Sequence, residues 1–180
     1  MKTRPKDIGT RAETAVVRAL WKLGFPHAER RALAGVHDLG DITGTPGVVW
    51  EIKGGVQAMD ATDGRIRKWL AETAVERANA AAPVGVLVVQ RRGVGAPNAK
   101  RWWAWMPLGQ MLALMGPDYV LSAPLYDTPV RMLLVDACML LRKAGYGDPL
   151  PEEWADHSAP FNKADAELWR DEPYDARKNR

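Results

Sequence analysis

Cysteine and histidine are scarce in this chain of 180 residues, which contains one cysteine and three histidines. A single thiol excludes an internal disulfide, and Cys138 lies among apolar residues at helical spacing, which is typical of a small buried side chain. The histidines His27, His37 and His157 lack the spacing of zinc ligands. We therefore expect neither a disulfide framework nor a zinc site.

Long apolar segments are also absent. The chain has no run of about 18 apolar residues, the length that a membrane-spanning helix requires. Its basic first residues are not followed by the apolar stretch of a signal peptide. Hydrophobic residues nevertheless make up 47% of the chain, which excludes a wholly disordered protein. We expect a cytoplasmic protein with no membrane partner, built as one domain with an appendage.

A large excess of one charge is missing as well, because 25 Lys and Arg residues stand against 22 Asp and Glu residues. The distribution is uneven: residues 1–106 carry 17 basic and 10 acidic side chains, residues 107–147 carry three of each, and residues 148–180 carry five and nine. The basic first part favours a polyanionic partner such as a nucleic acid. Soluble domains also acquire such an imbalance by chance, so charge alone leaves both interpretations open.

Hydrophobic spacing and turn residues divide the chain into alternating helices and strands. The predicted elements are a helix over 8–23, a hairpin whose second strand is 48–53, a helix over 62–80, strands over 84–89 and 101–105, and helices over 107–115 and 128–144. This order predicts an α/β fold with a central mixed sheet flanked by helices and with C-terminal helical decoration. We expect residues 1–106 to form the core, residues 107–147 a helical extension packed on it, and residues 148–180 an acidic, flexible tail.

Three charged residues come together in the predicted hairpin. Glu51 and Lys53 are two apart on a strand, so their side chains project from the same face, and Asp41 can lie opposite Glu51. Two converging carboxylates repel each other, and a divalent cation such as Mg²⁺ relieves that repulsion. A neighbouring lysine can position an attacking water or neutralise charge on a phosphate. Because Glu-x-Lys is also a common ion pair on solvated sheets, the pattern gains its weight from Asp41.

These residues belong to a longer ordered set. The set consists of Gly9 and Glu13 in the first predicted helix, Asp41-Ile42 after a glycine-punctuated stretch, and Trp50-Glu51-Ile52-Lys53. Over about residues 6–106 the sequence resembles the PD-(D/E)XK nuclease superfamily, and specifically its Holliday junction resolvase-like branch. It departs from the family at one position, because Gly40 stands where that family often has a proline before the aspartate.

The resemblance implies a restriction-endonuclease-like αβββαβ core and hydrolysis of DNA phosphodiester bonds with Mg²⁺ or Mn²⁺ as cofactor. Asp41 and Glu51 would be metal ligands and Lys53 the catalytic lysine. Glu13 would be an additional carboxylate near the metal. Asp38, thirteen residues before Glu51, competes with Asp41 for the ligand role, and we prefer Asp41 because it stands at the end of a strand.

The substrate and the assembly also follow from the resemblance, which implies branched DNA and a homodimer, because two symmetric cuts need two sites. Two alternatives remain: an exonuclease or restriction-like nuclease on linear, forked or flap DNA, and a catalytically silent DNA-binding module of the same fold. The basic residues expected at the DNA are Lys6, Arg11, Arg30, Arg31, Arg91 and Arg92. Trp102, Trp103 and Trp105 fit either the core or stacking on unpaired bases, and we prefer the core.

Overall fold

A mixed sheet of four strands forms the centre of the computed structural model, which describes residues 5–32, 38–116 and 127–151. The strands lie in the order β3 (Val48–Lys53), β4 (Val84–Val89), β5 (Trp103–Pro107) and β6 (Pro129–Leu133). β3 and β4 run parallel, whereas β4–β5 and β5–β6 are antiparallel. All six residues of β4 are buried, as expected of a strand covered on both faces. The predicted α/β class with a central mixed sheet is confirmed.

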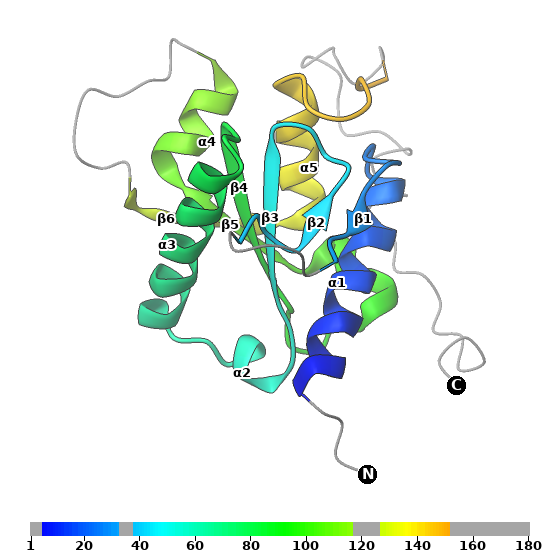
Figure 1. Ribbon diagram of the computed structural model, residues 1–180, viewed down its shortest axis with the longest axis vertical. Helices are drawn as coiled ribbons and strands as arrows, with labels where there is room; N and C mark the ends of the chain where they lie inside the picture. Colours follow the sequence, from blue (N-terminus) through cyan, green and yellow to red (C-terminus); the bar gives the residue numbers. More distant parts are fainter. Residues whose placement is uncertain (1–4, 33–37, 117–126, 152–180) are drawn as a thin grey trace.

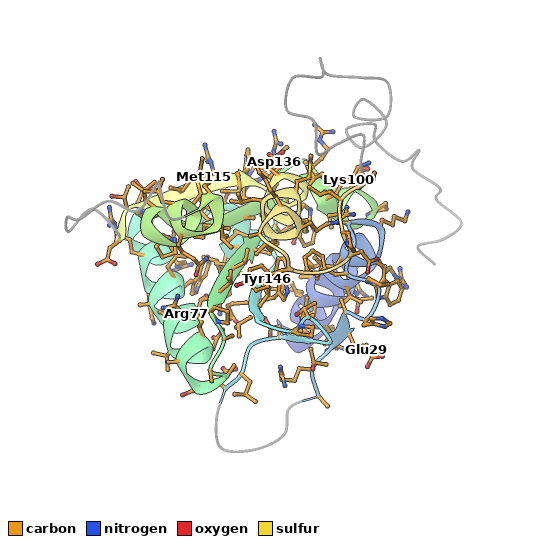
Figure 2. The ribbon with its side chains drawn as sticks, turned by 90° about the horizontal axis from the view of Figure 1, so that it is seen from above. Glu29, Arg77, Lys100, Met115, Asp136 and Tyr146 are labelled. Atoms are coloured by element: carbon orange, nitrogen blue, oxygen red, sulfur yellow. The ribbon has the colours of Figure 1, made fainter. Side chains whose placement is uncertain are left out.

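Helices cover both faces of this sheet (Figure 1). α1 (Pro5–Lys22) and α5 (Leu134–Lys143) pack on one face, and α3 (Asp63–Asn79) packs on the other. Figure 2 shows α3, which carries Arg77, and the blue α1 on opposite sides of the sheet. The short helices α2 (Val56–Met59), η1 (Ala96–Arg101) and α4 (Leu108–Met115) complete the described part.

The alternation of side chains along β3 decides which residues meet which layer. Trp50 and Ile52 join the hydrophobic cluster beneath α1. Glu51 and Lys53 therefore project toward α3, where Ile66 and Leu70 pack on the second cluster. The fold thus places both charged residues of the Glu-x-Lys pair in the layer between β3 and α3.

Two predicted elements need correction. The helix expected over 128–144 begins at Leu134, and the residues before it form β6, because β5 offers an open edge with which they pair. The first strand of the expected hairpin is β2 (Ile42–Thr43), which pairs with β1 (Glu29–Arg30) in a separate small sheet.

Part of the segment expected as a helical extension, residues 107–147, lies in the hydrophobic core. Leu134, Cys138 and Leu141 of α5 lie in the same buried cluster as Val16 and Leu20 of α1. Of the expected tail, residues 148–180, the part from 152 onward lies outside the described residues. Among the helices of the described ranges, none is long and apolar enough to cross a membrane.

Candidate active site

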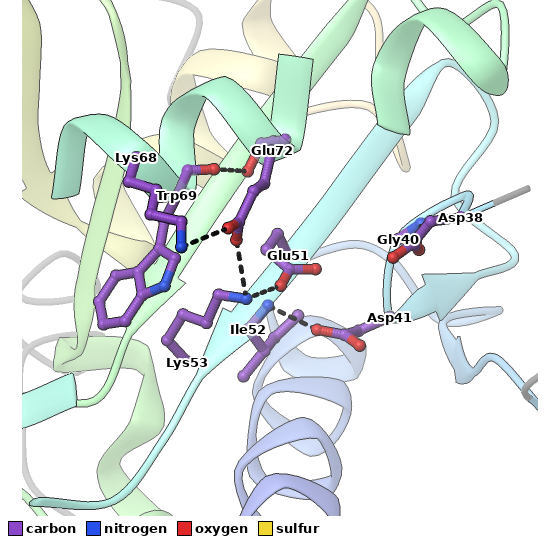
Figure 3. A network of polar contacts seen from close by, with 10 residues as sticks. Asp38, Gly40, Asp41, Glu51, Ile52, Lys53, Lys68, Trp69 and Glu72 are labelled. Carbon is purple, nitrogen blue, oxygen red and sulfur yellow. Dashed lines mark hydrogen bonds and ion pairs between the residues drawn. The ribbon is translucent and has the colours of Figure 1, made fainter. Parts of the chain in front are cut away.

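The candidate site lies at β3, an edge strand of the sheet, where the segment containing Asp41 approaches it (Figure 3). The Asp41 backbone N–H donates to the Trp50 carbonyl over 2.8 Å. The Asp41 carboxylate Oδ2 accepts the Ile52 backbone N–H over 2.7 Å. These two contacts, on either side of Glu51, hold the Asp41 carboxyl next to that of Glu51.

The turn before Asp41 requires a glycine. Gly40 has a φ of +84°, and a Cβ there would lie 2.7 Å from Val49 Cγ1 and 2.9 Å from the Trp50 carbonyl oxygen. Proline, with φ near −65°, cannot adopt this conformation. Arg31 fixes the same turn, because its backbone N–H donates to the Asp41 carbonyl over 2.8 Å and its Nε donates to the Gly40 carbonyl over 3.1 Å. The glycine at position 40 therefore has a local structural reason.

Lys53 lies between two carboxylates, as Figure 3 shows. Its ammonium group contacts Glu51 Oε1 and lies 3.4 Å from Oε2 of Glu72 on α3. Burial lowers the pKa of Lys53, but the Glu51 and Glu72 carboxylates raise it, and the net shift is upward. Lys53 is therefore a cation here, suited to donating hydrogen bonds and neutralising charge rather than to accepting a proton.

A fourth acidic side chain, which sequence reasoning missed, faces this group from α3. Glu76 is 4% exposed, and its Oε2 has no hydrogen-bond partner among the residues that the structure describes. Burial, then the nearby Asp38 and Asp41 carboxylates, raise the pKa of Glu76 to about 7. A signal was present in the sequence, because Glu76 falls on the buried stripe of α3 that also contains Ile66, Leu70 and Thr73.

The Asp41 and Glu51 carboxyls cannot both ionise at low cost. Burial raises the pKa of Asp41 to about 7, and the charge on Glu51 adds to the rise. Burial likewise raises the pKa of Glu51 to about 7, although Lys53 opposes that rise. Near neutral pH, protons or an added cation must therefore offset the negative charge that gathers at this point of the fold.

Glu13 and Asp38 lie beside the carboxyl pair and have other partners. Arg30 Nη2 lies 2.6 Å from Glu13 Oε2, and Arg30 Nε donates to the same oxygen over 2.7 Å. Glu13 is nevertheless close enough to raise the pKa of Asp41. Asp38 is exposed, and its Oδ1 accepts the Gly40 N–H over 3.1 Å, which is a turn-stabilising bond. The geometry thus places Asp41, rather than Asp38, against Glu51.

The basic residues predicted at the DNA have different surroundings. Two of them form ion pairs, Arg30 with Glu13 and Arg92 with Asp60. Arg31 donates hydrogen bonds to backbone carbonyls, and the Arg91 guanidinium carbon lies 4.3 Å from the centroid of the Trp103 ring. Arg11 is exposed on α1. The side chain of Lys6 lies outside the described part. Trp102, at 1% exposure, belongs to the core as preferred.

The donor set fits a hard divalent cation. Asp41 and Glu51 supply carboxylate oxygens, and the buried Glu76 nearby has an Oε2 with no hydrogen-bond partner among the described residues. Within residues 5–32, 38–116 and 127–151, no three acidic, histidine or cysteine side chains are already arranged to hold an ion. Mg²⁺ binds through as few as one or two carboxylates and keeps several waters, so the Asp41–Glu51 pair meets its requirement.

The comparisons with known proteins add no relative: no protein-family model, no curated protein and no solved structure matches this chain.

Proposed function

We propose that this protein is a metal-dependent deoxyribonuclease that hydrolyses phosphodiester bonds in branched DNA. The observation that carries the proposal is the convergence of the buried Glu51 carboxyl and the half-buried Asp41 carboxyl, each with a pKa of about 7, beside the cationic Lys53. A surface ion pair would explain Glu51 and Lys53, but it would not explain a second, half-buried acid held against Glu51. Branched DNA and a homodimer enter through the resemblance of residues 6–106 to junction resolvases.

The residues divide the work of hydrolysis among them. Asp41 and Glu51 would hold Mg²⁺ or Mn²⁺, which when bound supplies Lewis acidity toward the scissile phosphate and toward an attacking water. Lys53, held in place by Glu51 and Glu72, donates hydrogen bonds to the phosphate and neutralises the charge that develops on it. The Ile52 N–H keeps the Asp41 carboxylate in its orientation.

Glu76 has a supporting role in this proposal. Its buried carboxylate adds negative charge beside Glu51 and Asp41, which strengthens attraction for a cation without requiring a further ligand. Thr62 caps the N-terminal end of α3 by accepting the Arg65 N–H over 3.4 Å, so the helix that carries Glu72 and Glu76 begins at a defined place.

The test is a cleavage assay on a labelled four-way junction, a fork and a linear duplex, with Mg²⁺ or Mn²⁺ and again with EDTA. The proposal predicts metal-dependent cutting of the junction in preference to the duplex. Cutting of linear DNA ends at the same rate as the junction would indicate an exonuclease instead. Binding without any cutting would contradict the proposal and favour a silent DNA-binding module.

Variants decide between the two candidate aspartates. Asp41→Asn keeps an oxygen that can accept the Ile52 N–H but removes the charge, so we expect loss of cutting with DNA binding retained. Asp38→Asn removes a charge from an exposed turn residue and should leave cutting near the wild-type rate. The reverse result would show that the ligand assignment is wrong.

A further inference from the structure

The α3 side of the sheet carries a row of tryptophans beyond the candidate site. Trp69 on α3 and Trp103 and Trp105 on β5 are partly buried and pack on the same apolar cluster, which contains Leu87 and Val89. One edge of each indole is thereby fixed by packing while part of its surface stays accessible. These three side chains, with Arg65, Arg91 and Arg131, are called the tryptophan track below.

Cations lie over every ring of the track. The Arg91 and Arg131 guanidinium carbons lie 4.3 Å and 4.5 Å from the centroid of Trp103. Arg131 also lies 5.6 Å from the centroid of Trp105. In the described ranges no carboxylate forms an ion pair with either arginine, whereas the neighbouring Arg92 pairs with Asp60. The track therefore presents uncompensated positive charge next to aromatic surface.

The track is continuous with the candidate site. Lys53 Nζ lies 5.7 Å from the centroid of Trp69, and Arg65 lies 6.0 Å from the same ring. Lys53 is also in register with Val89, which is in register with Trp103. Strands in a sheet are about 4.8 Å apart, so Trp103 stands roughly 10 Å from Lys53, the length of about three stacked nucleotides at 3.4 Å each.

We propose that the tryptophan track binds a single-stranded DNA segment and leads it to or from Lys53. This inference rests on the proposed nuclease function and adds the form of DNA that the enzyme recognises. Unpaired bases stack on indole rings and on guanidinium planes, whereas a duplex hides its base faces. The uncompensated arginines match the phosphates of the same strand. The substrate is therefore a branch with an unpaired arm or an opened strand at the crossover.

The test measures binding of fluorescent oligo(dT) and of a matched duplex by anisotropy in EDTA, so that no cutting occurs. Trp103→Leu should weaken oligo(dT) binding by about 5- to 140-fold, the equivalent of one lost base stack, and Trp103→Phe should retain most of the affinity. Arg91→Gln and Arg131→Gln should each lower the salt slope for single strands by about 0.7. Duplex affinity should change little in Trp103→Leu.

Two controls match these changes on the opposite side of the sheet. Trp21→Leu removes an α1 tryptophan that is 50% exposed, and Arg18→Gln removes an exposed α1 charge; both should bind like wild type. Equal oligo(dT) affinity and salt slope in wild type and all track variants would overturn the proposal. The proposal would also be overturned if Trp103→Leu bound oligo(dT) like wild type but sedimented as a monomer where wild type sediments as a dimer. That result would show that this face binds a second copy of the chain.

The outcome separates this inference from the proposed function. A wild-type protein that binds oligo(dT) through the track but cuts no DNA contradicts the nuclease and leaves the track in place. A Trp103→Leu variant that cuts the junction with unchanged kcat and KM, and that binds oligo(dT) like wild type, contradicts the track and leaves the nuclease in place.

Discussion

Replacing Asp41 by asparagine should stabilise the metal-free protein near pH 8. The folded state holds the pKa of this carboxyl at about 7 instead of its ordinary 3.8, so the folded state binds its proton more tightly than the unfolded state does. Stability therefore falls as the pH rises from about 4 to about 7 and stays low above that range. The rise of this pKa from 3.8 to about 7, at about 1.4 kcal/mol per pKa unit, means that ionised Asp41 lowers the free energy of unfolding by at most roughly 4 kcal/mol.

The expected gain is smaller than this bound. Glu51 and Asp41 titrate together, so part of this loss of stability arises from both carboxyls and is not recovered by replacing one. We expect Asp41→Asn to raise the free energy of unfolding by about 2 kcal/mol at pH 8, or the Tm by about 4–8 °C. Because asparagine retains an acceptor for the Ile52 N–H, the fold should not lose that bond. The gain should be small near pH 4, where both carboxyls are protonated in the folded state and the pH is close to their ordinary pKa values of 3.8 and 4.5.

Urea unfolding followed by circular dichroism, in EDTA at both pH values, measures the effect. Glu29→Gln serves as the control, since Glu29 is exposed on β1 and its removal should leave the pH dependence of the unfolding free energy unchanged. Saturating Mg²⁺ should stabilise wild type at pH 8 and have little effect on Asp41→Asn. An Asp41→Asn protein that is less stable than wild type by the same amount at both pH values would refute the electrostatic argument.

Further predictions concern the site and the fold. Lys53→Met should lower the cleavage rate by about 100-fold or more while calorimetry still detects Mg²⁺ binding. If cleavage and Mg²⁺ binding were lost to the same extent, Lys53 would be needed for the structure of the site rather than for the reaction. Glu76→Gln should weaken Mg²⁺ binding by about 10- to 100-fold, and unchanged affinity would remove it from the site. Cys138 is buried, which raises the pKa of its thiol, so a thiol reagent should label it in urea and not in the native protein. Gly44→Ala should destabilise the protein by about 2–4 kcal/mol, because its Cβ would lie 1.8 Å from the His27 carbonyl oxygen. Gly64→Ala, with open space around the Cβ, should stabilise it by about 0.5–1 kcal/mol. Equal effects of the two substitutions on unfolding curves would contradict this prediction.

The elements with strong local signals could be predicted from the sequence. The run 84–89 is apolar and β-branched, which is typical of a strand buried on both faces, and β4 has those bounds. The strand β6 could not be found in the same way, since Val130, Met132 and Leu133 lead into the apolar pattern of α5 with no turn residue between them. Its strand conformation depends on the open edge of β5, which is a property of the assembled sheet.

The same distinction applies to the site. Asp41, Glu51 and Lys53 lie within thirteen residues, so strand alternation alone predicts that they meet. Glu72 and Glu76 reach the site only because α3 packs across β3, and helical spacing does not fix the position of that packing. The chain path brings Arg30, a predicted DNA contact, to Glu13, a contact between residues seventeen apart that no local pattern encodes.

The proposed nuclease activity requires the Asp41–Glu51 pair and Lys53 to act together with a divalent cation. The most direct measurement is the single-turnover cleavage rate of a labelled four-way junction in Mg²⁺ for wild type, Glu51→Gln and the exposed control Glu29→Gln, at protein concentrations that saturate binding. The proposed activity predicts cutting by wild type and Glu29→Gln, at least about 100-fold slower cutting by Glu51→Gln, and none in EDTA. Cutting by Glu51→Gln at the wild-type rate, or cutting by wild type that persists in EDTA, would contradict it.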